Sequence, residues 1–170
     1  MTWLQRIARA RIHLGIVSAA LAYWLARPTM ETIAWGALVA LPGEAIRVWA
    51  SGHLQKEREV TRSGPYRFVR HPLYLGSAII GLGFAVAAWS VWSALVVALY
   101  LGVTLAAAIR TEEGRLLDRY GGEYADYREG RAAPVARPFS IAQVMANREY
   151  RALLGFAAAL ALLWVRMRLL

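Results

Sequence analysis

The sequence lacks cysteine altogether, and a long part of it lacks charge. Without cysteine, the chain can form neither a disulfide framework nor a thiolate metal site, and it has no nucleophilic thiol. Residues 73–109 contain no Asp, Glu, Lys, Arg or His, whereas one membrane helix needs only about 20 apolar residues. Two membrane helices therefore fit into this stretch. The composition, 58% hydrophobic and 18% charged, also departs from that of ordinary soluble proteins.

Three further apolar segments, 12–26, 32–50 and 152–165, raise the expected number of membrane helices to about five. No cleavage site of small residues follows the segment 12–26, so we expect it to stay as a membrane helix. The sequence therefore predicts an all-α fold, a polytopic membrane helix bundle, in a single domain over residues 1–170.

Positive charge is concentrated in alternate connections between the apolar segments. The net charge is +9, yet the turn near 89–92 carries no charge and the turn near 27–31 carries a single arginine. This is the positive-inside pattern, which predicts an integral protein of the inner (plasma) membrane with its N-terminus in the cytoplasm. Contact with anionic lipid headgroups explains the charge, and no nucleic-acid partner is expected because no aromatic-basic module is visible.

The charge-free stretch predicts a helical hairpin. Pro72 suits the first turn of a helix, where its missing N–H is not needed. At 1.5 Å per residue such a helix crosses the membrane by Trp89, and a second helix from Val91 returns by Ile109. The segments that precede Pro72 and follow Ile109 therefore lie on the same, cytoplasmic side.

This geometry brings His71 near Glu112 and Glu113. The helix N-terminus at His71 favours an anionic group, and the two glutamates, which we expect just beyond the end of the fourth span, favour a cation. One small pocket could bind both kinds of group. The alternatives are that His71 only caps a helix and that the glutamates lie on a solvated surface.

The second and third spans contain features that point first to packing. Glu44 and Arg47 are three residues apart in apolar surroundings, where a structural ion pair is slightly favoured over a role in a site. Ser77, Gly81 and Ala85 form a stripe of small residues, which predicts close contact with another helix.

The segment that follows the hairpin predicts a cytoplasmic helical cap. Residues 112–120 have the pattern of an amphipathic helix, which Gly121 and Gly122 interrupt before a second short turn. For Tyr124 and Tyr127, packing of this cap and contact with a substrate are equally favoured.

Two motifs carry a family resemblance. "SGPYRFVRHPLYLG" and, after the hairpin, "RTEEGRLLDRYGGEYADYREGR" closely resemble the isoprenylcysteine carboxyl methyltransferase family and the related phospholipid methyltransferases. The resemblance extends from about Arg47 to Phe139. It implies an integral membrane enzyme that uses S-adenosylmethionine, with S-adenosylhomocysteine as product, without a Rossmann domain. The absence of a GxGxxG fingerprint is consistent with this expectation.

The resemblance also implies site residues, with the cofactor-binding part at about 60–139 and no metal ligand. The expected catalytic residues are His71, Glu112 and Glu113. A carboxylate acceptor needs no base, whereas an ammonium must first lose a proton to His71 or a glutamate. The cofactor would be bound by Tyr66, Arg70, His71, Pro72, Tyr74, Leu75, Gly76, Glu112 and Glu113. For the acceptor, we ourselves expect contacts with Arg47, Arg110, Tyr124 and Tyr127.

The implied reaction is methyl transfer to a lipophilic acceptor, a lipid or a prenylated small molecule in contact with membrane lipids. Isoprenylcysteine-type carboxyl O-methylation and phospholipid amine N-methylation both remain open. An NADPH-dependent membrane reductase of the sterol type is the alternative enzyme, but its motif usually has Asn and an acidic residue at the positions of Leu73 and Ser77. A small non-enzymatic membrane protein is the third alternative, and it gives no reason for the two motifs to converge.

Overall fold

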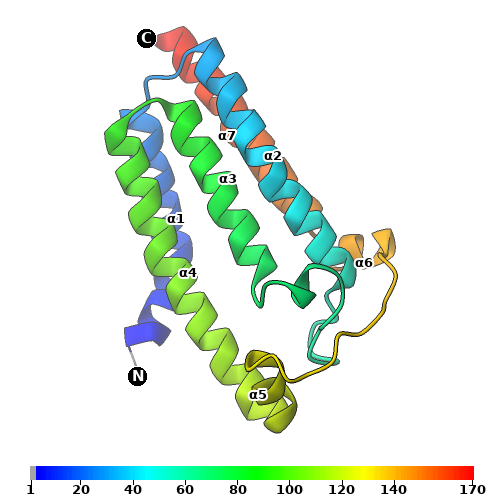
Figure 1. Ribbon diagram of the computed structural model, residues 1–170. Helices are drawn as coiled ribbons and strands as arrows, with labels where there is room; N and C mark the ends of the chain where they lie inside the picture. Colours follow the sequence, from blue (N-terminus) through cyan, green and yellow to red (C-terminus); the bar gives the residue numbers. More distant parts are fainter. Residues whose placement is uncertain (1–2) are drawn as a thin grey trace.

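The protein is a bundle of long helices with short helices at one end (Figure 1). The computed structural model describes residues 3–170, with side chains from residue 13 onward. No strand occurs in this part of the chain, and the predicted all-helical bundle is confirmed. The long helices are α1 (Trp3–Leu25), α2 (Met30–His53), α3 (Pro72–Ala88), α4 (Val91–Tyr120) and α7 (Tyr150–Leu169), and the short ones are the 3-10 turn η1 (Gly64–Arg67), α5 (Gly122–Arg128) and α6 (Ile141–Ala146).

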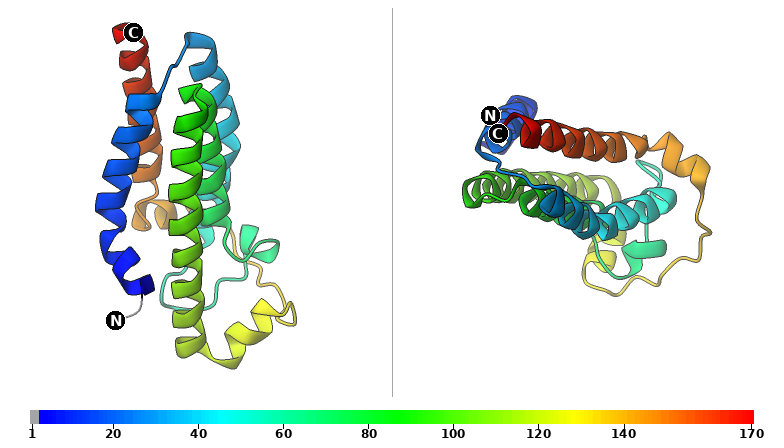
Figure 2. Two further views of the ribbon diagram at one scale, coloured as in Figure 1. Left: turned by 90° about the vertical axis from the view of Figure 1, so that its left-hand side faces the viewer. Right: turned by 90° about the horizontal axis from the view of Figure 1, so that it is seen from above.

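The long helices form two layers, with α2, α3 and α4 in one and α1 and α7 in the other (Figure 2). Three of them, α2, α4 and α7, are long and apolar enough to cross a membrane by length and composition. The apolar segments 13–25 and 72–88 are shorter. The N-terminus lies at the end of the bundle that carries η1, α5 and α6, which we call the cap end, and the C-terminus lies at the opposite end.

The predicted hairpin is formed by α3 and α4, and its first residue and its turn are where the sequence places them. Pro72 is the first residue of α3. Trp89 ends the helix in the left-handed region with φ 46°, and the Ser90 side chain caps α4 by accepting from the Ser93 N–H. The Trp89 and Trp92 side chains are exposed at this turn, which suits the membrane–water interface.

One prediction about the hairpin is wrong. We expected the fourth span to end near Ile109 and a separate cap helix to cover 112–120, but α4 continues without a break to Tyr120. The reason is that residues 110–120 contain no glycine pair or proline, and helix propagation is favourable once a helix exists. Glu112 and Glu113 therefore lie within a helix and not beyond its end.

Glycines bring the backbones of α2 and α3 into contact. A Cβ atom on Gly43 would lie 2.7 Å from the Gly76 carbonyl oxygen, and one on Gly83 would lie 2.6 Å from the Gly36 carbonyl oxygen. The two glycines of each helix are seven residues apart, so they lie on the same side of an α-helix. Small residues of this kind allow the close helix contact that is common in membranes.

The small-residue stripe predicted in α3 is only partly used for such contact. Gly81 faces Leu101 of α4, and the Ser77 hydroxyl faces Arg47 of α2. The close contact with α2 is made by Gly76 and Gly83, which belong to a neighbouring face of the same helix.

A strap that follows α5 crosses the cap end to reach α6 (Figure 1). Its backbone donates from Val135 to the Arg62 carbonyl and from Ser140 to the Gly52 carbonyl. Arg137 in the strap binds both carboxylate oxygens of Glu59, and this hydrogen bonding raises the pKa of the Arg137 guanidinium. These contacts hold α5 and α6 against the ends of the long helices.

Substitution of Gly83 by Ala should destabilise the bundle, because the added Cβ meets a backbone oxygen that cannot move aside. We expect a loss of about 1–3 kcal/mol, measured as a lower midpoint of thermal unfolding in detergent. Gly102→Ala is the matched control, since no atom lies within 4 Å of its Cβ position. An equal loss in both variants would contradict the packing role of Gly83.

Candidate functional site

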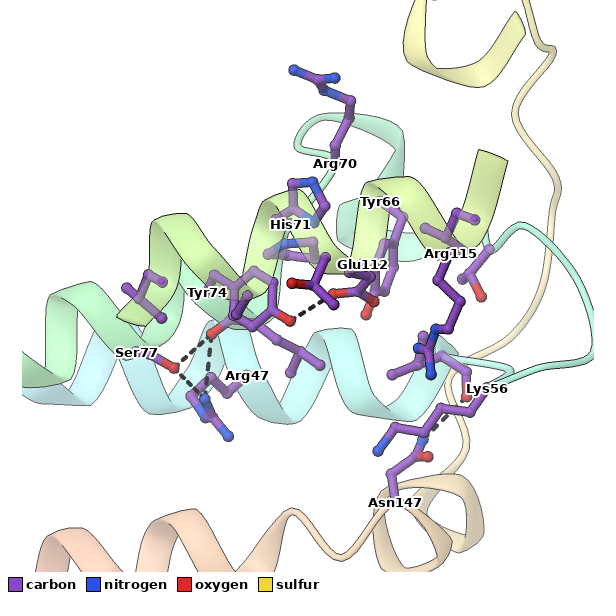
Figure 3. A pocket seen from close by; sticks show the side chains of 18 of the residues that line it. Arg47, Lys56, Tyr66, Arg70, His71, Tyr74, Ser77, Glu112, Arg115 and Asn147 are labelled. Carbon is purple, nitrogen blue, oxygen red and sulfur yellow. Dashed lines mark hydrogen bonds between the residues drawn. The ribbon is translucent and has the colours of Figure 1, made fainter. Parts of the chain in front are cut away.

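A cavity of about 1060 Å³ lies at the cap end, between the long helices and the cap (Figure 3). Its walls come from α2, α3, α4, α5, the loop 54–71 and the junction between α6 and α7. Small-molecule sites usually have volumes of about 300–1,000 Å³, so this cavity is large enough for two ligands side by side. Five of the eight tyrosines line it: Tyr66, Tyr74, Tyr100, Tyr124 and Tyr127.

A hydrogen bond between Tyr74 and Glu112 joins α3 to α4 inside the cavity. The Tyr74 hydroxyl donates to Glu112 Oε2 over 2.6 Å, and Figure 3 shows both side chains lying between the helices. The His71 ring stacks on the Tyr74 ring with their centroids 5.6 Å apart. The start of α3 and the C-terminal half of α4 thus present a carboxylate, an imidazole and an aromatic face to the same space.

Glu113 lies behind His71 and does not line the cavity. Its Oε1 is 3.1 Å from His71 Nε2 and 3.2 Å from Arg70 Nη1. Because an ionised carboxylate can only accept, His71 Nε2 carries the hydrogen in this contact. His71 occupies the N-cap position of α3 but makes no capping hydrogen bond with its side chain, so its ring orientation is set by Glu113.

Three tyrosines of the cap form the next part of the wall. Burial raises the pKa of the Tyr66 hydroxyl, and the charge of Glu112 adds to this effect. The pKa values of Tyr124 and Tyr127 rise to about 12, chiefly through burial. Tyr127 donates to the Tyr66 carbonyl over 2.8 Å, whereas the buried Tyr124 hydroxyl has no hydrogen-bond partner in the described part of the chain. All three hydroxyls therefore stay protonated at neutral pH.

Arg47 of α2 forms the part of the wall that lies farther from the cap. Its Nε donates to Glu149 Oε1 over 2.6 Å, and its Nη1 donates to the Leu73 carbonyl and to Ser77 Oγ. The sequence suggested a pair between Arg47 and Glu44, but Arg47 binds Glu149, and neither oxygen of Glu44 has a hydrogen-bond partner in the described residues. The reason is that Glu149, at the start of α7, lies next to the Nε side of the Arg47 guanidinium.

The structure brings most of the predicted site residues together. Those that line the cavity are Arg47, Tyr66, Arg70, His71, Pro72, Tyr74, Glu112, Tyr124 and Tyr127.

The other four predicted residues do not line the cavity. Gly76 is buried against Arg47 and Gly43, and Leu75 points away from the cavity on the exposed side of α3. Arg110 is exposed on the outer side of α4. Glu113 contacts the cavity only through His71 and Arg70.

Several cavity residues were not predicted from the sequence. Asn147 and Glu149 come from the junction between α6 and α7, and Lys56 and Arg115 also line the cavity. Figure 3 shows Lys56 beside Asn147. Glu149 is the one acidic residue after Glu129 in the sequence. That isolation, directly before an apolar segment, is the signal that could have identified it.

The arrangement suits a ligand that carries both signs of charge. The Glu112 carboxylate and the faces of the surrounding tyrosines favour a cation, while Arg70 and the N-terminus of α3 favour a carboxylate. The described residues contain no group of three or more His, Asp or Glu side chains that could hold a metal ion. The site can therefore bind and orient an organic zwitterion next to an apolar molecule.

The comparison with protein families decides the class of the molecule. The profile of the phospholipid methyltransferase family matches residues 10–123, which include α2, α3, α4 and most of α1. The chain belongs to the phospholipid methyltransferase family. Membership confirms the resemblance found in the two motifs and implies methyltransferase activity in a membrane. The match ends before the junction between α6 and α7.

One curated relative is similar over part of its length. The nickel-cobalt-cadmium resistance protein NccN of Alcaligenes xylosoxydans xylosoxydans is 29% identical over 106 residues, which are 61% of this chain and 48% of that protein. The chain thus aligns with about half of the relative it matches. No solved structure matches the chain.

Raised tyrosine pKa values predict a specific response to alkali. Unfolded tyrosines ionise near pH 10, whereas Tyr124 and Tyr127 in the folded protein keep their protons to about pH 12. The folded state then binds more protons than the unfolded state, so stability is lost as the pH rises from about 10 to 12. Tyrosinate absorbance should show a late step that is smaller in Tyr124→Phe; complete titration of the folded protein near pH 10 would contradict the burial of these hydroxyls.

Proposed function

We propose that this chain transfers a methyl group from S-adenosylmethionine to a lipophilic acceptor within the membrane. The observation that carries the proposal is the Glu112 carboxylate, held by Tyr74 inside a cavity of aromatic side chains at the end of a membrane helix bundle. The family supports the transfer of a methyl group, and the cavity volume of about 1060 Å³ supports two ligands together.

The side chains that line the cavity fit S-adenosylmethionine. That molecule supplies an electrophilic methyl group on a sulfonium, which the acceptor takes by in-line displacement as S-adenosylhomocysteine leaves. Glu112 would bind its ammonium, and Arg70 with the N-terminus of α3 would bind its carboxylate. Tyr66 and Tyr74 offer aromatic faces to the adenine or the sulfonium. The buried Tyr124 hydroxyl, which has no hydrogen-bond partner in the described residues, is available to a bound molecule.

His71 has a role that depends on the acceptor. In-line displacement needs positioning more than proton chemistry, so a carboxylate acceptor requires no base. An ammonium acceptor must first lose a proton. Both His71 and Glu112 line the cavity, so either side chain could accept this proton. Glu113 orients the His71 ring in both cases, because it holds Nε2.

Binding of S-adenosylhomocysteine to the purified protein in detergent tests this proposal. The wild-type protein should bind it in calorimetry, and Glu112→Gln and Arg70→Gln, which each remove a charged partner of the ligand, should each weaken binding about tenfold or more, since a charge-assisted hydrogen bond contributes about 1.5–3 kcal/mol. Glu31→Gln, at the opposite end of the bundle, is the matched control and should bind normally. Binding of NADPH in place of S-adenosylhomocysteine would support a reductase and reject the proposal.

The reaction itself is tested with lipid extracts and isotopically labelled S-adenosylmethionine. Mass spectrometry should find a lipid that gains one or more methyl groups, and the labelled atom identifies O- or N-methylation. No labelled lipid in any extract would reject a lipophilic acceptor.

We also propose that the cap end faces the cytoplasm of a plasma membrane, because most basic residues of the connections lie there. The absence of cysteine allows a direct test with single cysteines at exposed positions. Glu31→Cys should react with a membrane-impermeant maleimide on intact cells, and Ala133→Cys should react only after permeabilisation. The reverse pattern would overturn this orientation.

A further inference from the structure

The junction between α6 and α7 contributes to the cavity although it lies outside the segment that matches the family. It is fixed to the C-terminal end of α2 by side-chain amides: Asn147 donates to the Ser51 and Leu54 carbonyls, and Gln143 donates to the Leu54 carbonyl. These contacts satisfy carbonyl groups that a helix end leaves without an intrahelical partner. The junction is therefore a built part of the cavity wall.

Glu149 is the charged residue that this junction places at the cavity. It is 7% exposed, and its carboxylate binds Arg47 Nε over 2.6 Å. A buried charge of this kind is strongly unfavourable unless it is paired. The contact joins two segments 102 residues apart in the sequence, so it is made only in the folded molecule.

The contacts of Arg47 leave one side of its guanidinium available. Nε binds Glu149, and Nη1 binds the Leu73 carbonyl and Ser77 Oγ. Nη2 has no hydrogen-bond partner in the described part of the chain, and Arg47 lines the cavity. Three contacts thus fix the plane of the guanidinium, while two N–H donors stay available to a ligand.

Arg47 lies on the apolar side of the proposed cofactor residues. Ser77, which it contacts, lies three residues beyond Tyr74 in α3, almost one helical turn farther from the cap. The neighbouring cavity wall consists of small and apolar side chains of α4, including Thr104, Leu105 and Ala108. A lipophilic acceptor that reaches the cavity from the membrane would meet Arg47 next to this wall.

We propose that Glu149 is the positioning residue of the acceptor site: it holds the guanidinium of Arg47, which the sequence already predicts to contact the acceptor, toward an oxygen atom in the polar end of the acceptor. A carboxylate, ester or phosphate oxygen would suit the two Nη2 donors. The C-terminal helix is then part of the acceptor site and not only a membrane anchor. This inference rests on the proposed methyl transfer and assigns a further residue to it.

The test compares Glu149→Gln with Gln143→Ala in methyl transfer from labelled S-adenosylmethionine to a graded amount of lipid extract. Glu149→Gln should raise the apparent KM for the extract about tenfold, while its affinity for S-adenosylhomocysteine stays within about twofold of the wild type. Gln143→Ala, which removes an anchor of the same junction outside the cavity, should lower the melting temperature and leave the apparent KM unchanged. Glu149→Asp keeps the charge and should recover part of the loss.

Two results would overturn the inference. An equal rise of the apparent KM in Glu149→Gln and Gln143→Ala would show that the junction acts only through its docking on α2. A loss of S-adenosylhomocysteine affinity in Glu149→Gln would assign Arg47 to the cofactor. Failure of the proposed function is distinguishable, because the wild-type protein would then bind no S-adenosylhomocysteine. Glu123→Gln, which breaks an ion pair with Arg62 away from the cavity, is the matched charge control and should behave as the wild type.

Discussion

The cavity depends on the close contact between α2 and α3. Two pairs of glycines let the backbones meet with no side chain between them, with Gly43 against Gly76 and Gly83 against Gly36. This contact places the first turns of α3 beside Arg47, which then reaches the Leu73 carbonyl. Wider helix separation would remove that contact and the support it gives to the guanidinium. The close packing of α2 against α3 therefore supports the polar contacts of Arg47.

The two ends of the bundle differ for a physical reason. At the opposite end, short turns join α1 to α2 and α3 to α4. These turns only reverse the direction of the chain and cover no polar site among the described residues. At the cap end, polar groups of the cavity are covered by several segments: the loop 54–71, α5, the strap and α6. Contacts such as Tyr74 to Glu112 and Arg47 to Glu149 satisfy side chains that would be unfavourable without partners in a bilayer.

The chemistry follows from how these partners are distributed. Carboxylate, imidazole and aromatic groups come from α3, α4 and the cap, which belong mostly to the part of the chain shared with the phospholipid methyltransferase family. Glu149 is the N-cap residue of α7 and lies beyond this part. In the proposed function, Arg47 would bind the acceptor from within the segment that matches the family, and Glu149 would position Arg47 from outside that segment.

The sequence by itself determined the helices and their order. Apolar segments bounded by charge must form helices in hydrocarbon, because every backbone N–H and carbonyl needs a partner within its own segment. Pro72 and Ser90 then mark where α3 and α4 begin. The proximity of His71 to Glu112 followed as well, since a hairpin of equal spans returns to its starting side.

Only the tertiary structure decided which charged groups pair. Arg47 has one glutamate three residues away and binds another 102 residues away, and nothing local in the sequence distinguishes the two. It likewise decided that Glu113 supports His71 from behind while Glu112 faces the cavity, because adjacent residues of a helix point about 100° apart. Both outcomes depend on how the helices are rotated against one another, and side-chain packing across the whole bundle sets that rotation.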